Sequence, residues 1–284
     1  MPNDKNDRNK FKLKYYLPEF IMIFTVISII ISYLLIYLID LHNMAGLRDY
    51  LFSLNQVYFF FDYHPFVFHN WYRNGGIAEI MSWVFLGGAA VSSAFIAGRS
   101  QEKDTRVYLF WRMMAVAFIF MLIEDAGDPR HTIRSFVQGI YREPIQGTMG
   151  TITELIYFSL MAFIPFYALL RYGKVLFKSF RSLFYTIAGI IFYAIGTGLS
   201  FLGDAIDLYH NQGVILYDWV VGLGDGELAM IWQNYEAEIG WRFINYFLMD
   251  SLIEETFELL GAAAFFAAVL AFLFKDYKKI RDDG

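Results

Sequence analysis

Six long apolar runs dominate the sequence, and their length constrains the fold more than any other feature. A helix rises about 1.5 Å per residue, so roughly 20 apolar residues cross the hydrocarbon core of a bilayer. Lipid offers the backbone no hydrogen-bond partners, and a helix satisfies these groups within each run. The runs cover residues 17–40, 76–98, 107–125, 151–170, 182–202 and 243–274. They predict an all-α polytopic integral membrane protein, a six-helix transmembrane bundle that forms a single transmembrane domain over residues 1–284.

The composition agrees with a lipid bilayer as the main surrounding of the protein. Hydrophobic residues make up 57% of the chain and charged residues 18%, whereas soluble domains have about 45–50% and 25%. The basic residues form short clusters between apolar runs and no continuous basic face, which argues against nucleic acid as a partner. The chain contains no cysteine, so disulfides and thiolate metal ligands are excluded.

The positions of the basic residues predict the orientation of the bundle. Every lysine lies within residues 5–14, 99–106, 171–181 or 275–281. Six spans place these four segments on one side, and cytoplasmic loops are the ones enriched in Lys and Arg. The opposite loops contain no lysine, and their arginines are Arg48, Arg73, Arg130, Arg134, Arg142 and Arg242. We therefore predict that both termini are inside, and we expect the cytoplasmic membrane of a prokaryote.

The predicted outer loops differ from the inner ones in length and composition. They cover about residues 41–75, 127–149 and 209–242, and all five histidines lie in or beside them. Their mixture of aromatic, apolar and acidic residues is typical of short helices that lie in the membrane interface. Several residues before the second span are placed to line a hydrophobic access route or an interfacial belt: Phe59, Phe60, Phe61, His64 and Trp71.

Acidic residues gather at the outer ends of the spans, where they are the best functional signal of the sequence. An ionisable side chain at the centre of a span costs roughly 2.5–3.5 kcal/mol on insertion scales and marks a functional site by default. The third and fifth spans both end in the pattern D-A-x-D-x-x-H, at Asp125 and at Asp204. The sixth span carries Asp250, Glu254 and Glu258 on one helical face, with Glu255 beside it.

Counting at 1.5 Å per residue places the acids of five helices in one layer, about 24–38 Å from their cytoplasmic ends. Asp128 precedes Pro129, which disfavours helix at residue 128. Asp128 is therefore expected to cap a new short helix, with His131 on a different helix from Glu124.

Crowded carboxylates in a low dielectric must be protonated, paired with arginine or bound to a cation. Helix-borne carboxylates with D-x-x-H spacing favour a metal, because bundle sites for iron and manganese use Glu with E-x-x-H, a likeness of chemistry and not of kinship. We predict one or two divalent ions, Fe, Mn or Zn, near the outer face. The candidate ligands are Glu124, Asp125, Asp128, His131, Asp204, Asp207, His210, Glu254, Glu255 and Glu258.

Three functional hypotheses follow from this acidic layer. The first is a membrane metalloprotein, and if it is an enzyme, one that acts on a lipophilic small molecule. The second is a cation- or proton-coupled transporter or channel. The inner halves of the spans argue against it, because they are almost purely apolar. The third is a structural or accessory subunit beside other membrane subunits, in which Arg130, Arg134 and Arg242 neutralise the acids. The sequence does not separate redox from hydrolytic chemistry.

The predicted orientation is testable in a chain that has no cysteines to remove. Single cysteines at Lys103, Lys178 and Lys278 should react with maleimides only from the cytoplasmic side, and cysteines at the histidine positions only from outside. The wild-type chain is the unlabelled control. Labelling at Lys178 by an impermeant reagent added outside would contradict the orientation.

Overall fold

The structure is a computed structural model that describes residues 5–58, 66–73, 75–142, 148–205, 208–239 and 244–275. These residues are helical apart from short turns, and they contain no strand. Contacts divide the chain into two compact units. Unit 1 comprises Met1–Thr25, Ser82–Tyr193 and Leu260–Gly284, and unit 2 comprises Val26–Met81 and Ala194–Leu259. The prediction of a single transmembrane domain stays a prediction.

The six predicted spans are confirmed as helices of spanning length. The part of the chain that the structure describes has six stretches that are long and apolar enough, at Lys14–Leu41, Val67–Ser100, Thr105–Gly127, Thr148–Lys178, Phe180–Gly203 and Ile244–Leu273. Each of them overlaps one predicted run. They indicate a membrane-integral helical protein, while the orientation of its termini stays a prediction.

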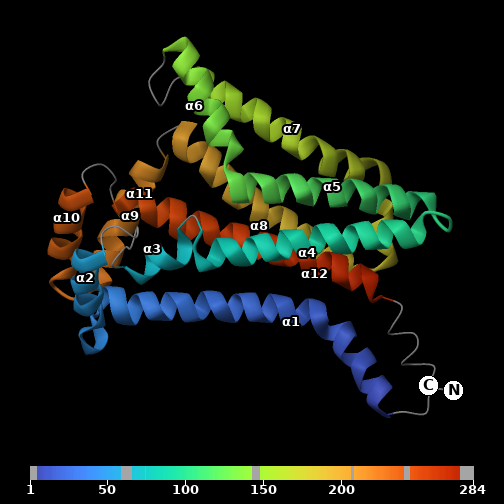
Figure 1. Cartoon of the computed structure of the whole chain (residues 1–284), viewed down its shortest axis with the longest axis horizontal. Helices are drawn as coiled ribbons and strands as arrows, with labels where there is room; N and C mark the ends of the chain where they lie inside the picture. The colour runs from blue at the N-terminus through green and yellow to red at the C-terminus, as the bar shows by residue number, and fades with distance from the viewer. Residues whose placement is uncertain are drawn as a thin grey trace. The chain divides into compact units, whose positions relative to one another are not determined.

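Figure 1 shows the helices that build these stretches and the shorter helices that connect them. The spanning elements are α1 (Lys5–Leu35) with the π-helix η1 (Ile36–Leu41), α3 (Val67–Tyr72) with α4 (Ile77–Ser100), α5 (Thr105–Gly127), α7 (Thr148–Tyr172) with η4 (Gly173–Lys178), α8 (Phe180–Ala205), and α11 (Ile244–Phe247) with the π-helix η5 (Leu248–Glu254) and α12 (Glu255–Leu273). The connecting elements are η2 (Met44–Gly46), α2 (Leu47–Tyr58), α6 (Pro129–Tyr141), α9 (Leu208–Leu223) and α10 (Leu228–Ile239).

The core of unit 1 forms around the C-terminal part of α12. Almost every residue from 261 to 272 is buried there. The ring of Phe265 lies 5.5 Å from that of Phe118 in α5 and 6.1 Å from that of Tyr193 in α8. Trp111 of α5 meets Phe272 at a centroid distance of 5.0 Å. Aromatic pairs at these distances add to the burial of their apolar surface.

A glycine permits the close approach of α8 and α12. A Cβ atom at Gly261 would lie 2.9 Å from the backbone nitrogen of Tyr193 and 3.0 Å from its Cβ. Backbone cannot move aside as a flexible side chain would. The prediction that the small residues at 261–264 serve helix packing is therefore confirmed at Gly261, and small residues at such contacts are common between membrane helices.

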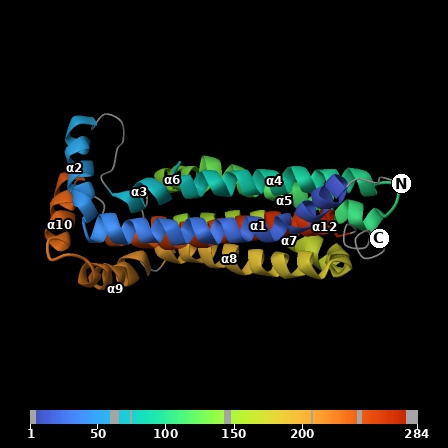
Figure 2. The same cartoon turned by 90° about the horizontal axis from the view of Figure 1, so that it is seen from below.

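Unit 2 has an aromatic core formed by helices that connect the spans. Helices α2 and α10 lie side by side in both views (Figures 1 and 2), and Phe52 of α2 meets Tyr235 of α10 at 6.3 Å. Phe66 and Trp232 are fully buried, with their rings 6.2 Å apart. These aromatic side chains pack against one another inside unit 2.

A buried aspartate and arginine join the elements of unit 2. The carboxylate of Asp40 accepts hydrogen bonds from the backbone N–H groups of Val67 and Phe68, each at 2.9 Å, and so caps the start of α3. The guanidinium of Arg48, which is also fully buried, donates to the carbonyl oxygen of Asp40 at 3.1 Å and pairs with Asp225 at 2.9 Å. The two charged side chains therefore hold α2, α3 and the α9–α10 turn to the end of η1.

The aromatic residues predicted to line an access route fall mostly outside the described residues. Phe59, Phe60, Phe61 and His64 belong to that part of the chain. Trp71 lies in α3 and is half-buried. The access route stays a prediction.

The α8–α12 contact predicts a position-specific effect of a single methyl group. Gly261→Ala should destabilise the protein by about 1–3 kcal/mol, because the added Cβ overlaps backbone atoms of Tyr193. Gly98→Ala is the matched control, since a Cβ there has no neighbour within 4 Å. Unfolding in mixed micelles with rising SDS measures both variants. Equal midpoints for the two variants would contradict the close approach.

Candidate functional site

The junction of α5 and α6 is a sharp break at Asp128. This residue adopts the left-handed conformation with φ 45° and ψ 46°, and its backbone N–H closes α5 by donating to the Glu124 carbonyl at 2.9 Å. Asp tolerates this conformation better than most residues. Pro129 then occupies the first turn of α6. The predicted break is confirmed, and His131 lies on a different helix from Glu124.

The side chain of Asp128 does not cap α6 as the sequence predicted. It makes no capping hydrogen bond to the α6 backbone. Its Oδ1 atom lies 2.6 Å from Nδ1 of His131 instead. This contact is half exposed, and a protonated histidine there would balance the aspartate charge.

Helix α6 turns a polar stripe toward the rest of unit 1. Arg130, Arg134 and Gln138 are its buried residues, spaced four apart on one face. This face packs on the first turns of α7. A Cβ atom at Gly150 would lie 2.3 Å from Nε2 of Gln138, so glycine at this position makes room for the stripe.

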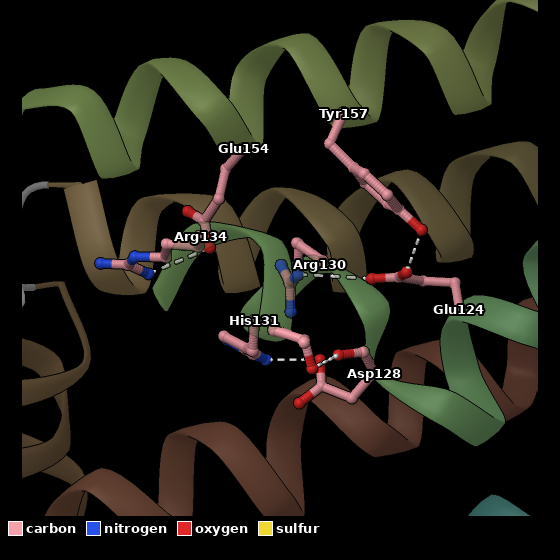
Figure 3. Close-up of polar contacts among 8 residues, drawn as sticks. Glu124, Asp128, Arg130, His131, Arg134, Glu154 and Tyr157 are labelled. Atoms are coloured by element: carbon pink, nitrogen blue, oxygen red, sulfur yellow. Dashed lines mark hydrogen bonds and ion pairs between the residues drawn. The ribbon is translucent and has the colours of Figure 1, made fainter. Parts of the chain in front are cut away.

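Arg130 balances the carboxylate at the end of α5. Its Nε lies 3.4 Å from Oε1 of Glu124, and its guanidinium stacks over the ring of Phe158 at 4.9 Å. The hydroxyl of Tyr157 donates to the other oxygen of Glu124 at 2.5 Å. Figure 3 shows that Glu124 lies between these two partners, which come from α6 and α7. Such charge-assisted contacts are stronger than neutral ones.

Arg134 forms a second and more deeply buried pair. Its Nη1 atom donates to Oε1 of Glu154 at 3.0 Å (Figure 3). The side chains are only 5% and 1% exposed, so the pair is shielded from water. Glu124 of α5 and Glu154 of α7 thus each have an arginine of α6 as a partner.

The second group of acids lies in unit 2, at η5 and the start of α12. Glu254 is 8% exposed and accepts a hydrogen bond from the hydroxyl of Tyr209. Burial and, next, the charge of Glu254 raise the pKa of Tyr209 above its usual range, which keeps this hydroxyl protonated as a donor. Asp250 also contributes to this rise, so its carboxylate lies near the same tyrosine.

The neighbours of Glu254 along the chain are less buried. Glu255 and Glu258 are half-buried, and His210 is exposed. A Cβ atom at Gly196 would lie 2.6 Å from Cγ of Glu258, so this glycine lets the glutamate pass close to α8. Glu254 ends a π-helical segment, a distortion that occurs frequently at functional sites.

The predicted metal ligands that lie in the described part of the chain do not come together as one group. Among the residues that it describes, no three His, Asp or Glu side chains are gathered closely enough to hold a metal ion. Glu124, Asp128 and His131 belong to unit 1 with the half-buried Asp125, and His210, Glu254, Glu255 and Glu258 belong to unit 2. Asp207 and the side chain of Asp204 lie outside the described residues.

Sequence reasoning missed the tyrosines and the anchor of unit 2. Tyr157 and Tyr209 both donate to span carboxylates, but neither stands out in an aromatic-rich chain. From the sequence alone, Asp40 is the end of a predicted span and Arg48 is one of the loop arginines. An aspartate at the end of a long apolar run, with an arginine eight residues later, is the signal that points to them.

Comparison with known proteins gives no relative for this chain. No family model, no curated protein and no solved structure matches it. The interpretation of the site therefore rests on its own residues.

The buried pair of Arg134 and Glu154 predicts strong coupling between the two residues. Arg134→Met should destabilise the protein by about 3–5 kcal/mol, because it leaves a buried carboxylate without its charge partner. The double variant with Glu154→Leu should regain most of that loss. SDS titration in mixed micelles measures the cycle.

The exposed pair of Lys178 and Asp104, 2.5 Å apart, is the control for this cycle. Lys178→Ala should change the unfolding free energy by about 1 kcal/mol or less. Lys178 also holds the pKa of Asp104 below its usual value. Additive effects of the Arg134 and Glu154 changes would show that the pair is not coupled.

Proposed function

We propose that this membrane protein is a metalloprotein whose cation is held by the acidic segment of unit 2. The proposed ligands are drawn from Asp204, Asp207, His210, Glu254, Glu255 and Glu258, and the proposed cofactor is one or two ions of iron, manganese or zinc. These oxygen and imidazole donors suit such metals. The observation that carries the proposal is Glu254, a buried carboxylate at the end of a π-helix, oriented by the hydroxyl of Tyr209.

In metal sites, residues that do not touch the metal position the ligating carboxylates by hydrogen bonds. Tyr209 is suited to this role because its hydroxyl donates to the carboxylate of Glu254. The tyrosine comes from α9 and the glutamate from η5, so the contact also fixes the two elements to each other. Asp204 and Asp207 immediately precede α9 in the sequence, which brings further carboxylates to the same part of the chain.

The acids of unit 1 support a different role. Arg130 faces Glu124 and Arg134 faces Glu154, so both glutamates already have a positive charge beside them. We therefore narrow the proposed ligand set and leave out Glu124, Asp125, Asp128 and His131, which the sequence had placed in it. We propose that this cluster holds α5, α6 and α7 together.

A metal near the outer face would serve an enzyme that acts on a lipophilic substrate, by activating water or oxygen beside the bilayer. A structural or accessory subunit is the second candidate. The arginine–glutamate pairs of unit 1 favour it, because they show how this chain stabilises buried acids without a metal.

Metal analysis of the purified full chain tests the proposal. Glu254→Gln should lower the iron, manganese or zinc content per folded protein, because it removes a charged ligand. Tyr209→Phe should weaken metal binding by about 10–100-fold, as expected when an outer hydrogen bond to a ligand is lost. Elemental analysis after size-exclusion chromatography measures the content.

Glu154→Gln is the matched control, since it also removes a buried carboxylate from a span. The metal content of this variant should equal that of the wild type, because Glu154 already forms an ion pair with Arg134. A wild-type protein without metal, or an equal loss in the Glu154 and Glu254 variants, would contradict the proposal and favour the structural role.

A further inference from the structure

Helix α6 is amphipathic with the opposite arrangement to that of a helix in a water-soluble protein, because its polar face is buried and its apolar face is exposed. Its buried face holds Arg130, Arg134 and Gln138. Its largest apolar side chains point outward, with Phe136 70% and Ile140 62% exposed. A helix surrounded by water buries its apolar stripe and exposes its charges. The arrangement of α6 therefore requires an apolar surrounding on part of its surface.

From residue 132 to residue 140, the exposed surface of α6 is divided into two sectors of different polarity. Ile133, Phe136 and Ile140 follow the spacing i, i+3 and i+7, which places them on one side of the helix. Thr132, Ser135 and Gly139 follow the same spacing and are also exposed. At about 100° per residue, the centres of the two sectors lie roughly 100° apart around the helix axis. The buried stripe lies on the remaining side of the helix.

The elements that hold α6 place it beside the bilayer. It follows the spanning helix α5 after the single residue Asp128, and its polar stripe packs on the spanning helix α7. Helix α7 itself exposes Leu155 and Leu160, 54% and 68% respectively. Exposed leucines on a spanning helix face lipid. Acyl chains that contact α7 can therefore also contact the apolar sector of α6.

We infer that α6 lies at the lipid–water boundary, with its apolar sector in the acyl chains of the bilayer and its Thr132–Ser135–Gly139 sector toward the headgroups and water. A protein partner that covers the apolar sector is the alternative occupant, which the experiment below distinguishes from lipid. Interfacial helices combine one face in the acyl region with a polar face above it. This inference is independent of the proposed metal.

The inference gives the ion pairs of unit 1 a membrane context. Lipid on one side of α6 and α7 on another keep water away from Arg134 and Glu154. Electrostatic attraction is stronger in such a low dielectric. The bilayer would thus contribute to the binding of α6 to α7, and the pairs would in turn keep two arginines out of contact with acyl chains.

Nitroxide scanning of α6 tests the inference directly in the full chain. Single cysteines are introduced at positions 132, 133, 135, 136, 139 and 140, spin-labelled, and reconstituted in vesicles of phosphatidylcholine and phosphatidylglycerol. Accessibility to oxygen, which concentrates in lipid, is compared with accessibility to a water-soluble nickel chelate. Leu160→Cys on α7 is the lipid-facing reference, and Glu102→Cys in the exposed α4–α5 turn is the water-facing one.

Labels at positions 133, 136 and 140 should match the Leu160 reference, with oxygen access several-fold above nickel access. Labels at 132, 135 and 139 should show the reverse preference. Nickel access at 136 and 140 equal to that of the Glu102 label would place the apolar sector in water and overturn the inference. Exclusion of both reagents from 136 and 140 would also overturn it, because it would show a covering protein surface.

Discussion

The cost of taking a charged side chain out of water is the constraint on which the rest of this structure depends. An apolar bundle offers no solvent to a carboxylate or a guanidinium, so each buried charge needs a partner from another element. The protein meets this need in three ways. Arginine faces glutamate in the α5–α6–α7 cluster, backbone N–H groups receive Asp40 at the start of α3, and a tyrosine hydroxyl donates to Glu254. Each contact also joins two different helical elements.

These contacts suit the two groups of acids to different roles. In unit 1, a positive charge stands beside Glu124 and Glu154, and the result is a cross-link between helices. In unit 2, the hydroxyl of Tyr209 donates to Glu254 and orients its carboxylate. A carboxylate held in this way is suited to bind a cation. The two groups of acids therefore differ in a contact that the structure shows, an arginine beside each glutamate of unit 1 and a tyrosine hydroxyl at Glu254.

The polarity of α6 follows from the same constraint. Its arginines are useful only where they reach the glutamates of α5 and α7, so the polar stripe faces the protein and the apolar residues must face outward. We infer that lipid beside this helix stabilises it. The glycine at position 150 completes the arrangement, because a larger residue would displace Gln138 and Arg134 from α7.

The sequence by itself determined the membrane-integral all-helical class, the six stretches of spanning length and the break at Asp128 and Pro129. These features are local: apolar length, helix geometry and the restriction that proline places on its neighbour decide them. Only the tertiary structure decided which arginine or tyrosine each buried glutamate meets, because these partners lie on different helices and the tyrosines are far away along the chain. Tyr157 is 33 residues from Glu124, and Tyr209 is 45 residues from Glu254. No periodicity encodes such a pairing; it depends on which faces of two helices meet, and this is settled by packing among side chains from many elements.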